Sequence, residues 1–368
     1  MGRKNGMAKA VFYAHTMPGV EDIAWLEIRK LIPYAQFVDK LFAKERNGIV
    51  MFEHDGPIQP MLGLRTTEDL FLMALSLDKI SRGWKDLYQL TKLIARRAEF
   101  KDAVDQLMQF QRDNQQSGIP TYRIVRRTYG RYEFQPKDLE RSIEKGIKAR
   151  YPHWKLVNDE HARIEVWVNI LGTRLIIGLR LTDHTMSQRF KKVKQLKTAL
   201  RPSIAAAMIH LTEPDSNDVF LDPMSGSGTL LMERRMAGPY QQLLGGDNNL
   251  AHAQFSDVNV SRMRKERPSS FTIHHLNGKN LPFADGSIDK VATQLPFGHH
   301  NRLARLYPPF FAELARVLKE NGRAVIFSSE YDLLKDAVRK QPKLTTLTGY
   351  SISTKHQWGR IYIIRRDP

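Results

Sequence analysis

The stretch that decides the fold of the C-terminal half reads Val219-Phe-Leu-Asp-Pro-Met-Ser-Gly-Ser-Gly-Thr229. Its apolar start predicts a short buried strand that ends at Asp222, and the glycines at positions 226 and 228 predict a tight turn into a helix. Glycine lets the backbone turn sharply and approach a ligand closely, and the first amides of the next helix then point at that ligand. The segment therefore predicts a ligand site at the start of an α/β domain.

Strand-like and helix-like patterns alternate along the rest of this half. The predicted strands are 219–221, 242–245, 271–275, 288–293 and 324–328, with a final pair near 344–353 and 360–365, and helices at 250–263 and 304–319 lie between them. This alternation predicts a doubly wound, Rossmann-like α/β sheet.

A second carboxylate follows the glycine turn. Asp247 ends the second predicted strand about 20–25 residues later, where a carboxylate can accept both hydroxyls of a ribose. Position 231 is leucine where a dinucleotide fingerprint needs glycine, and no Gly-Lys-Ser/Thr run follows the turn. These departures favour a nucleoside cofactor without a pyrophosphate, of which S-adenosylmethionine is the commonest. The alternative role for Asp247 is a helix N-cap.

The segment Ala292-Thr-Gln-Leu-Pro-Phe-Gly298 follows the fourth predicted strand, at the sheet edge where open α/β folds place reactive groups. It resembles the Asn/Asp-Pro-Pro-Tyr/Phe motif of methyltransferases that act on exocyclic amines of nucleobases. The resemblance implies that the side chain of Gln294 and the carbonyl of Leu295 accept the two amine N–H bonds. Pro296 would form the turn, and Phe297 would stack on the base. Gln replaces Asn at position 294, and a displacement of the accepting oxygen by about 1 Å can cost on the order of a hundredfold in rate. The alternative for the whole segment is a loop that merely ends a strand.

The N-terminal half predicts two smaller α+β modules and a linker. Residues 10–60 contain short strands around a helix near 20–31, and the next module begins with helices at 67–77, 84–97 and 100–114. A strand at 121–127, a helix at 136–151 and strands at 163–169 and 174–181 complete it. Six basic residues and no acidic one lie between Met186 and Arg201, which indicates an exposed linker. The expected divisions are residues 1–61, 62–185, 186–200 and 201–368.

The charge balance points to a polyanionic partner, because 57 Lys and Arg against 39 Asp and Glu give a net charge of +18. Cations also alternate with aromatic residues over 122–134, which suits RNA contacts, although an ordinary strand face would give the same pattern. The linker cations could neutralise phosphates or simply be solvated. The candidate RNA-binding residues are Arg123, Arg126, Arg127, Arg131, Arg189, Lys191 and Lys192.

Several classes of protein are disfavoured by what the sequence lacks. The chain has no Cys, which excludes disulfides, thiolate metal sites and a cysteine nucleophile, and no metal ligand set at the usual spacing is expected. No apolar stretch reaches the roughly 18 residues of a membrane span, and the first residues lack the apolar run of a signal peptide. We therefore expect a cytoplasmic protein without membrane contact.

Together the motifs are similar to those of the THUMP-containing tRNA guanine-N2 methyltransferases. The resemblance rests on residues 200–208, 222–229, 245–247, 281–286, 294–298 and 358–362, and it includes a helix start at 64–69. It implies a Rossmann-like class I methyltransferase domain preceded by an α+β region, with a ferredoxin-like domain followed by a THUMP domain. It also implies methyl transfer from S-adenosylmethionine to N2 of a guanosine in the acceptor-stem region of tRNA, with position 6 favoured and position 10 next, by a monomer.

The resemblance further implies which residues hold the cofactor. Asp222, Gly226 and Gly228 would hold the methionine end, Asp247 the ribose, and Asn277 the adenine in place of the usual Asp. The full candidate set is Asp222, Met224, Ser225, Gly226, Gly228, Thr229, Asp247, Asn248, Asn277, Gly278 and Gln294. Gln294 and Asn277 keep two alternatives open: a tRNA-binding protein with reduced catalysis, and an amine methyltransferase acting on another nucleobase.

Overall fold

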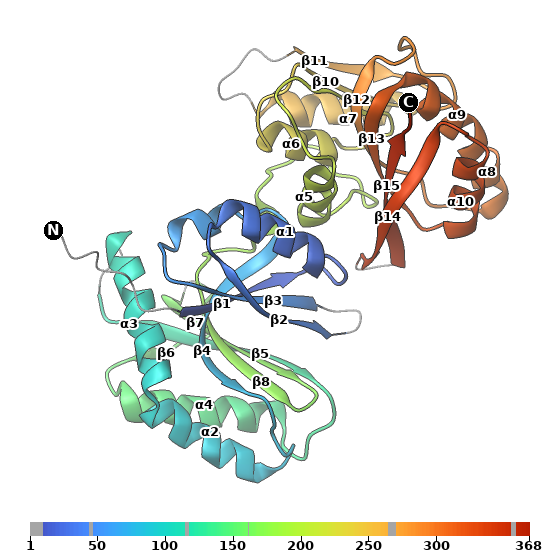
Figure 1. The fold of residues 1–368 in the computed structure, drawn as a ribbon. Helices are drawn as coiled ribbons and strands as arrows, with labels where there is room; N and C mark the ends of the chain where they lie inside the picture. The colour runs from blue at the N-terminus through green and yellow to red at the C-terminus, as the bar shows by residue number, and fades with distance from the viewer. Residues whose placement is uncertain (1–9, 44–46, 115–117, 161, 264–269, 355–357) are drawn as a thin grey trace.

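The computed structural model describes residues 10–43, 47–114, 118–160, 162–263, 270–354 and 358–368, and its two halves each contain a β-sheet (Figure 1). The strands of the N-terminal sheet are β1 (Ala10–Thr16), β2 (Gln36–Ala43), β3 (Asn47–His54), β4 (Thr67–Leu77), β5 (Thr121–Tyr129), β6 (Lys155–Leu156), β7 (Ile164–Leu171) and β8 (Arg174–Arg180). Their order across the sheet is β2-β3-β1-β4-β8-β7-β5-β6. Because β4 pairs with β1 on one side and β8 on the other, the segments on both sides of residue 61 share this sheet. The division at 61/62 stays a prediction.

Helices α1 (Glu21–Leu31), α2 (Trp84–Arg96), α3 (Ala98–Asp113) and α4 (Pro136–Arg150) accompany this sheet, with short 3₁₀ turns at Gln59–Gly63 and Met186–Gln188. The helix α2 packs along α4, and α3 packs against β4. Apolar side chains such as Leu90 of α2, Leu107 of α3 and Ile143 of α4 form one core with the strands.

One predicted helix is wrong. Residues Thr67–Leu77 form the strand β4, and the helix start expected at residues 64–69 is absent from this described segment. Leucine, methionine and alanine in this run favour a helix intrinsically, but the strand lies in the interior of the sheet with most of its side chains buried. Burial between two neighbouring strands outweighs a propensity difference of less than about 1 kcal/mol per residue.

The C-terminal sheet confirms the predicted doubly wound fold. Its strands are β9 (Val219–Asp222), β10 (Gln242–Asp247), β11 (Ser270–His275), β12 (Ile288–Gln294), β13 (Leu318–Ser328), β14 (Leu344–Ser353) and β15 (Trp358–Arg366), in the order β11-β10-β9-β12-β13-β15-β14. The first five of that order run parallel, and β15 is antiparallel to both of its neighbours. The helices are α5 (Pro202–Leu211), α6 (Thr229–Met236), α7 (Leu250–Ser261), α8 (His300–Ala304), α9 (Tyr307–Val317) and α10 (Tyr331–Arg339).

The position of β9 determines where a ligand can bind. It pairs with β10 on one side and β12 on the other, so the direction in which the chain adds strands reverses there. The carboxyl ends of these three parallel strands therefore meet at one edge, beside the crevice in which open α/β sheets bind their ligands.

The two halves meet through both apolar and charged contacts. Val20 and Ile23 of the first half share a core with Ile204 and Met208 of α5. Partly buried ion pairs also join them, including Arg65 with Glu233 at 2.8 Å. The remaining predicted divisions, at 185/186 and 200/201, stay predictions.

A membrane-spanning helix is not found within the described ranges, where no helix combines the necessary length and apolar character.

Candidate active site

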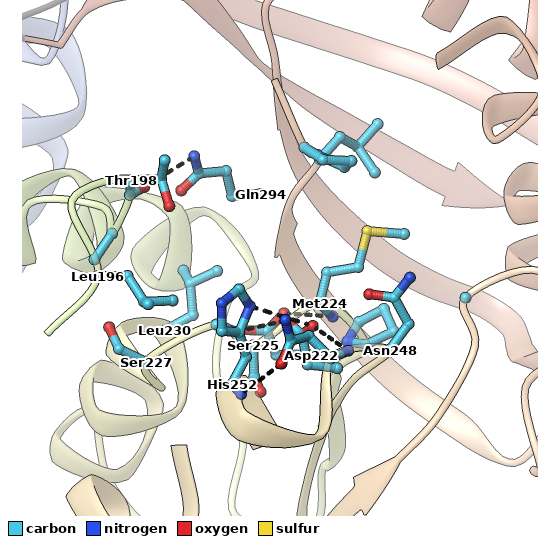
Figure 2. Close-up of a pocket in the computed structure, with 18 of the residues that line it drawn as sticks. Leu196, Thr198, Asp222, Met224, Ser225, Ser227, Leu230, Asn248, His252 and Gln294 are labelled. Atoms are coloured by element: carbon cyan, nitrogen blue, oxygen red, sulfur yellow. Dashed lines mark hydrogen bonds and ion pairs between the residues drawn. The ribbon is translucent and has the colours of Figure 1, made fainter. Parts of the chain in front are cut away.

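A cavity of about 430 Å³ opens at the carboxyl ends of β9, β10 and β12 (Figure 2). The glycine turn after β9, the end of β10, the loop after β11 and the loop after β12 supply its wall. Apart from Gly228, every residue predicted to bind the cofactor lines it. These residues are Asp222, Met224, Ser225, Gly226, Thr229, Asp247, Asn248, Asn277, Gly278 and Gln294. The structure thus brings the candidate residues together, while their binding role stays a prediction.

The glycines shape the turn in two different ways. Gly226 has a φ of 54° and lines the cavity, whereas Gly228 has a φ of 81° and is the N-cap of α6. A Cβ atom at position 228 would lie 2.8 Å from the hydroxyl oxygen of Ser256 on α7. Gly228 therefore permits a left-handed backbone and a close approach of two helices, and it positions the cavity wall without forming it.

Asp222 is a buried carboxylate at the end of β9. Its Oδ1 atom accepts hydrogen bonds from the Thr293 hydroxyl at 2.9 Å and from the Met224 amide at 3.3 Å. The pKa of Asp222 is raised to about 7, because burial and, to a smaller extent, the charge of Asp247 raise it by more than these two bonds lower it. Such a carboxylate gains most from a cationic ligand group, which would stabilise its charged form.

Asp247 is tied to the turn from the neighbouring strand. Its Oδ2 atom accepts the Gly226 amide at 3.1 Å, and its Oδ1 atom accepts the Asn249 amide at 2.9 Å. The N-cap of α7 is Asn249, whose side chain accepts the amides of Ala251 and His252. The helix-capping alternative for Asp247 is therefore wrong, and its carboxylate lies in the cavity wall.

Residues on the far side of β10 complete the wall. A Cβ atom at Gly278 would lie 2.8 Å from the terminal methyl carbon of Met224, so glycine keeps this part of the wall open. The Oδ1 atom of Asn277 accepts the Lys279 amide at 3.0 Å, which fixes its side-chain amide in the loop after β11. His252 also lines the cavity, and its ring lies 3.5 Å from Asp247. The sequence did not indicate it as a site residue, because it belongs to neither the glycine turn nor the segment 292–298.

Gln294 ends β12 and lies beside Thr198, apart from the cluster around Asp222 and His252 (Figure 2). Its Nε2 atom donates to the Thr198 carbonyl at 3.3 Å, and no hydrogen bond to its Oε1 atom is found among the described residues. The backbone amide of Leu295 donates to the Phe327 carbonyl at 2.9 Å, and Pro296 also lines the cavity. The ring of Phe297 meets Phe327 edge to face at 5.9 Å. The segment thus offers a free amide oxygen beside a fixed aromatic ring.

The candidate RNA-binding cations fall into three environments. Arg123 and Arg126 pair with Glu165 and Glu140, and Arg127 lies over the Trp167 ring. Two linker cations turn inward: Arg189 pairs with Glu233 on α6, and Lys192 donates to the Thr229 hydroxyl at 2.6 Å. Arg131 and Lys191 are exposed. The segment 186–200 is thus partly anchored, and RNA binding by these residues stays a prediction.

Comparisons with known proteins agree with this geometry. Residues 189–356 match the family UPF0020, described as an RMKL-like methyltransferase domain. The tRNA (guanine(6)-N2)-methyltransferase of Thermus thermophilus is 24% identical over 335 residues, which are 88% of this chain and 91% of that protein. The Bos taurus tRNA (guanine(6)-N(2))-methyltransferase THUMP3 is 28% identical over 200 residues. This chain spans only 39% of the length of that relative.

Solved structures support the fold over the full chain. TrmN from Thermus thermophilus superposes with a TM-score of 0.77 at 22% identity, covering 98% of this chain and 100% of that one. Another solved chain, which is complexed with SAH, gives a TM-score of 0.68 at 15% identity and covers 96% of this chain and 97% of that one. Residues 189–356 therefore match an RMKL-like methyltransferase domain of the UPF0020 family, and the chain has the class I methyltransferase fold.

Proposed function

We propose that the protein transfers a methyl group from S-adenosylmethionine to the exocyclic N2 amine of a guanosine in the acceptor-stem region of tRNA, at position 6 in preference to position 10. The observation that carries this proposal is the meeting of Asp222, Asp247 and Gln294 at the ends of three adjacent parallel strands, in the wall of one cavity. The named activity of the Thermus thermophilus relative, which matches along nearly its whole length, supports guanine, tRNA and position 6.

The cavity suits S-adenosylmethionine, whose sulfonium supplies an electrophilic methyl group. The Ser225 hydroxyl lines this cavity, is buried, and has no hydrogen-bond partner among the described residues. Because buried polar groups are nearly always paired, this hydroxyl is suited to a polar ligand. The Asp222 carboxylate, at the end of β9, would face the ammonium of the methionine end, which carries the opposite charge. The Asp247 carboxylate, at the end of β10, would accept hydrogen bonds from the ribose hydroxyls.

Gln294, Leu295 and Phe297 would orient the amine of the target base. An amine attached to an aromatic ring is a poor nucleophile, because its lone pair is delocalised into the ring. Acceptance of its two N–H bonds by the Gln294 Oε1 atom and the Leu295 carbonyl would direct the lone pair toward the methyl group, which is a positioning and electrostatic effect. The Phe297 ring would stack on the base. A base in a duplex must leave the stack to reach this position.

The net charge of +18 supports RNA as the partner, because phosphate neutralisation by Lys and Arg dominates nucleic-acid affinity. Two finer features, the monomeric state and the cytoplasmic location, stay predictions. A tRNA-binding protein with reduced catalysis is the second candidate function, and the presence of Gln rather than Asn at position 294 is the observation that favours it.

Incubation with unmodified tRNA transcripts and methyl-labelled S-adenosylmethionine tests the proposal. Nucleoside digestion and mass spectrometry should show N2-methylguanosine that maps to one acceptor-stem position. Label on a different base would favour another amine methyltransferase. Binding of tRNA without methyl transfer, together with transfer by the Gln294→Asn variant, would favour the second candidate.

A further inference from the structure

A second cavity, of about 490 Å³, adjoins the first and shares part of its wall, including Thr198, Gln294 and Phe297. Besides the segment that carries Gln294 and Phe297, three parts of the chain build it. Met17 follows β1, residues between 187 and 204 come from the linker and α5, and Thr354 follows β14. The cavity therefore lies where the N-terminal half meets the methyltransferase domain, next to Gln294 and Phe297.

The wall of this second cavity combines positive charge with aromatic rings. Three cations line it, and no Asp or Glu is among its described lining residues. Phe190 and Phe297 add flat apolar faces. An aromatic face beside cations suits a ligand that carries both a planar ring and an anionic group, and a nucleotide is such a ligand. The three cations are Lys192, Lys197 and Arg201.

Arg201 is held by a carboxylate from the N-terminal sheet. Its Nε atom donates to Oε1 and Oε2 of Glu68 on β4, at 2.9 and 2.8 Å, and its Nη2 atom also donates to Oε2. Hydroxyls of Ser187 and Ser203 donate to the same carboxylate, which fixes its orientation. No bond from Nη1 of Arg201 to another described residue is found, so one edge of the guanidinium remains for a ligand.

Lys192 brings a second cation to the partition between the cavities. Its Nζ atom donates to the Thr229 hydroxyl at 2.6 Å and lies 3.4 Å from the Ser227 hydroxyl, and both of these residues line the first cavity. No ion pair of this ammonium is found among the described residues; burial lowers its pKa to about 8, and the charge of Glu233 acts in the opposite direction. Thr229 begins α6, where a cation is unfavourable and an anion is stabilised. The ammonium therefore has no carboxylate in direct contact among the described residues, and an anionic ligand group could provide that contact.

We propose that the second cavity binds the target nucleotide as a base together with its phosphate, with the base against Phe297 and the phosphate on Arg201 and Lys192. Glu68 is then a positioning residue, because it holds the guanidinium of Arg201 without touching the ligand. The N-terminal half thereby completes the nucleotide site of the methyltransferase domain. This inference rests on the proposed function and adds the phosphate contact and the role of Glu68.

Binding of small nucleotides to the full chain, saturated with SAH, tests the inference. Guanosine, guanosine 5′-monophosphate and guanosine 3′-monophosphate are titrated by calorimetry or by ligand-observed NMR. One of the monophosphates should bind about tenfold more tightly than guanosine, since a charge-assisted contact is worth about that factor. Arg201→Gln should remove the advantage. Lys194→Gln, which removes a cation of the same segment that lines neither cavity, should leave it intact.

The role of Glu68 has its own readout. Glu68→Gln should weaken monophosphate binding several-fold and leave guanosine and SAH binding unchanged, with the thermal midpoint recorded to exclude loss of folding. Equal affinities of guanosine and both monophosphates for the unaltered protein would overturn the phosphate contact. Equal loss of guanosine, monophosphate and SAH binding in Glu68→Gln would overturn the positioning role.

The two proposals fail in distinguishable ways. Methylation of a tRNA guanosine without any monophosphate advantage would remove the inference and leave the proposed function standing. A monophosphate advantage that Arg201→Gln abolishes, with no methylation of any tRNA, would remove the proposed function and leave the nucleotide site.

Discussion

The hydroxyl of Thr293 donates a 2.9 Å hydrogen bond to the Oδ1 atom of Asp222, which joins the carboxyl ends of β12 and β9. Both residues are buried, so this bond works in a poorly solvated environment. It places Gln294, the next residue along β12, at a fixed position relative to the carboxylate. This pair therefore sets the distance between the carboxylate proposed to hold the cofactor and the amide proposed to orient the amine.

The ionisation of Asp222 should make cofactor binding depend on pH. Because its pKa is raised to about 7, mainly by burial, its carboxyl is partly protonated at neutral pH. The charged form is the one that attracts an ammonium, so the affinity for SAH should rise as the pH increases from 6 to 8. Asp222→Asn should bind SAH roughly 10–100-fold more weakly at pH 8 and lose this dependence. Calorimetry across this pH range checks both.

His252→Gln is the matched control, because His252 lies beside Asp247 and also lines the cavity. This variant should retain the pH dependence of SAH binding if Asp222 causes it.

The carboxyl of Asp222 also affects the stability of the fold. An unfolded aspartate has a pKa of about 3.9, so the stability contributed by the raised folded-state pKa is present below about pH 4 and lost as the pH rises through 7. Asp222→Asn should therefore show a smaller loss of thermal stability between pH 5 and 8.

Removal of the second carboxylate should separate cofactor binding from RNA binding. Asp247→Ala deletes the acceptor of the Gly226 and Asn249 amides and the proposed ribose contact. We expect SAH binding to become undetectable, while tRNA affinity in a gel-shift assay stays within about twofold, because the RNA contacts are proposed to lie elsewhere. Loss of both activities in a folded variant would contradict this division of roles.

The glycine turn is the part of the site that the sequence predicted best. A strand, two glycines and a helix form a local pattern, and the short distance along the chain leaves few alternative structures. The ends of β10 and β12 were predicted for a similar reason, since parallel strands place their carboxyl ends at one edge. The second cavity was not predicted, because Glu68 and Arg201 lie 133 positions apart and no local pattern indicates that they meet.

The strand β4 could not be predicted from its own residues. Its residues favour a helix by propensity, and only the neighbouring strands β1 and β8 determine its conformation. The charge run after Met186 indicates an exposed linker, but its cations Arg189 and Lys192 contact α6. Partners that are distant in sequence decide both cases.

Gly228→Ala should destabilise the fold more than a change at a similar but open glycine. Its φ of 81° strains any side chain, and the added Cβ would lie 2.8 Å from the Ser256 hydroxyl oxygen. Gly172 has a φ of 64° and no described residue places an atom within 4 Å of an added Cβ, so Gly172→Ala isolates the backbone term of about 1–2 kcal/mol. Urea unfolding should show a loss for Gly228→Ala that is larger by about 1 kcal/mol or more. Equal losses would mean that α6 and α7 do not pack this closely.

Glu233→Gln should weaken the attachment between the two halves. Glu233 is 1% exposed and accepts bonds from Arg65 and from Arg189, so its neutralisation leaves two half-buried guanidinium groups without a charged partner. Breaking a buried ion pair costs about 3–5 kcal/mol. Glu99→Gln, which removes the carboxylate of the exposed Arg97–Glu99 pair, should cost less than about 1 kcal/mol. Urea unfolding of both variants measures the contrast, and similar small losses would contradict the buried contact.

The central claim is transfer to the N2 amine of a guanosine, and a matched pair of tRNA transcripts tests it most directly. One transcript carries guanosine at position 6, and the other carries inosine, which is the same base without the N2 amine. The account predicts that methyl label from S-adenosylmethionine enters the guanosine transcript as N2-methylguanosine and that the inosine transcript gains none at this position. Equal labelling of the two transcripts, or no labelling of either, would contradict it.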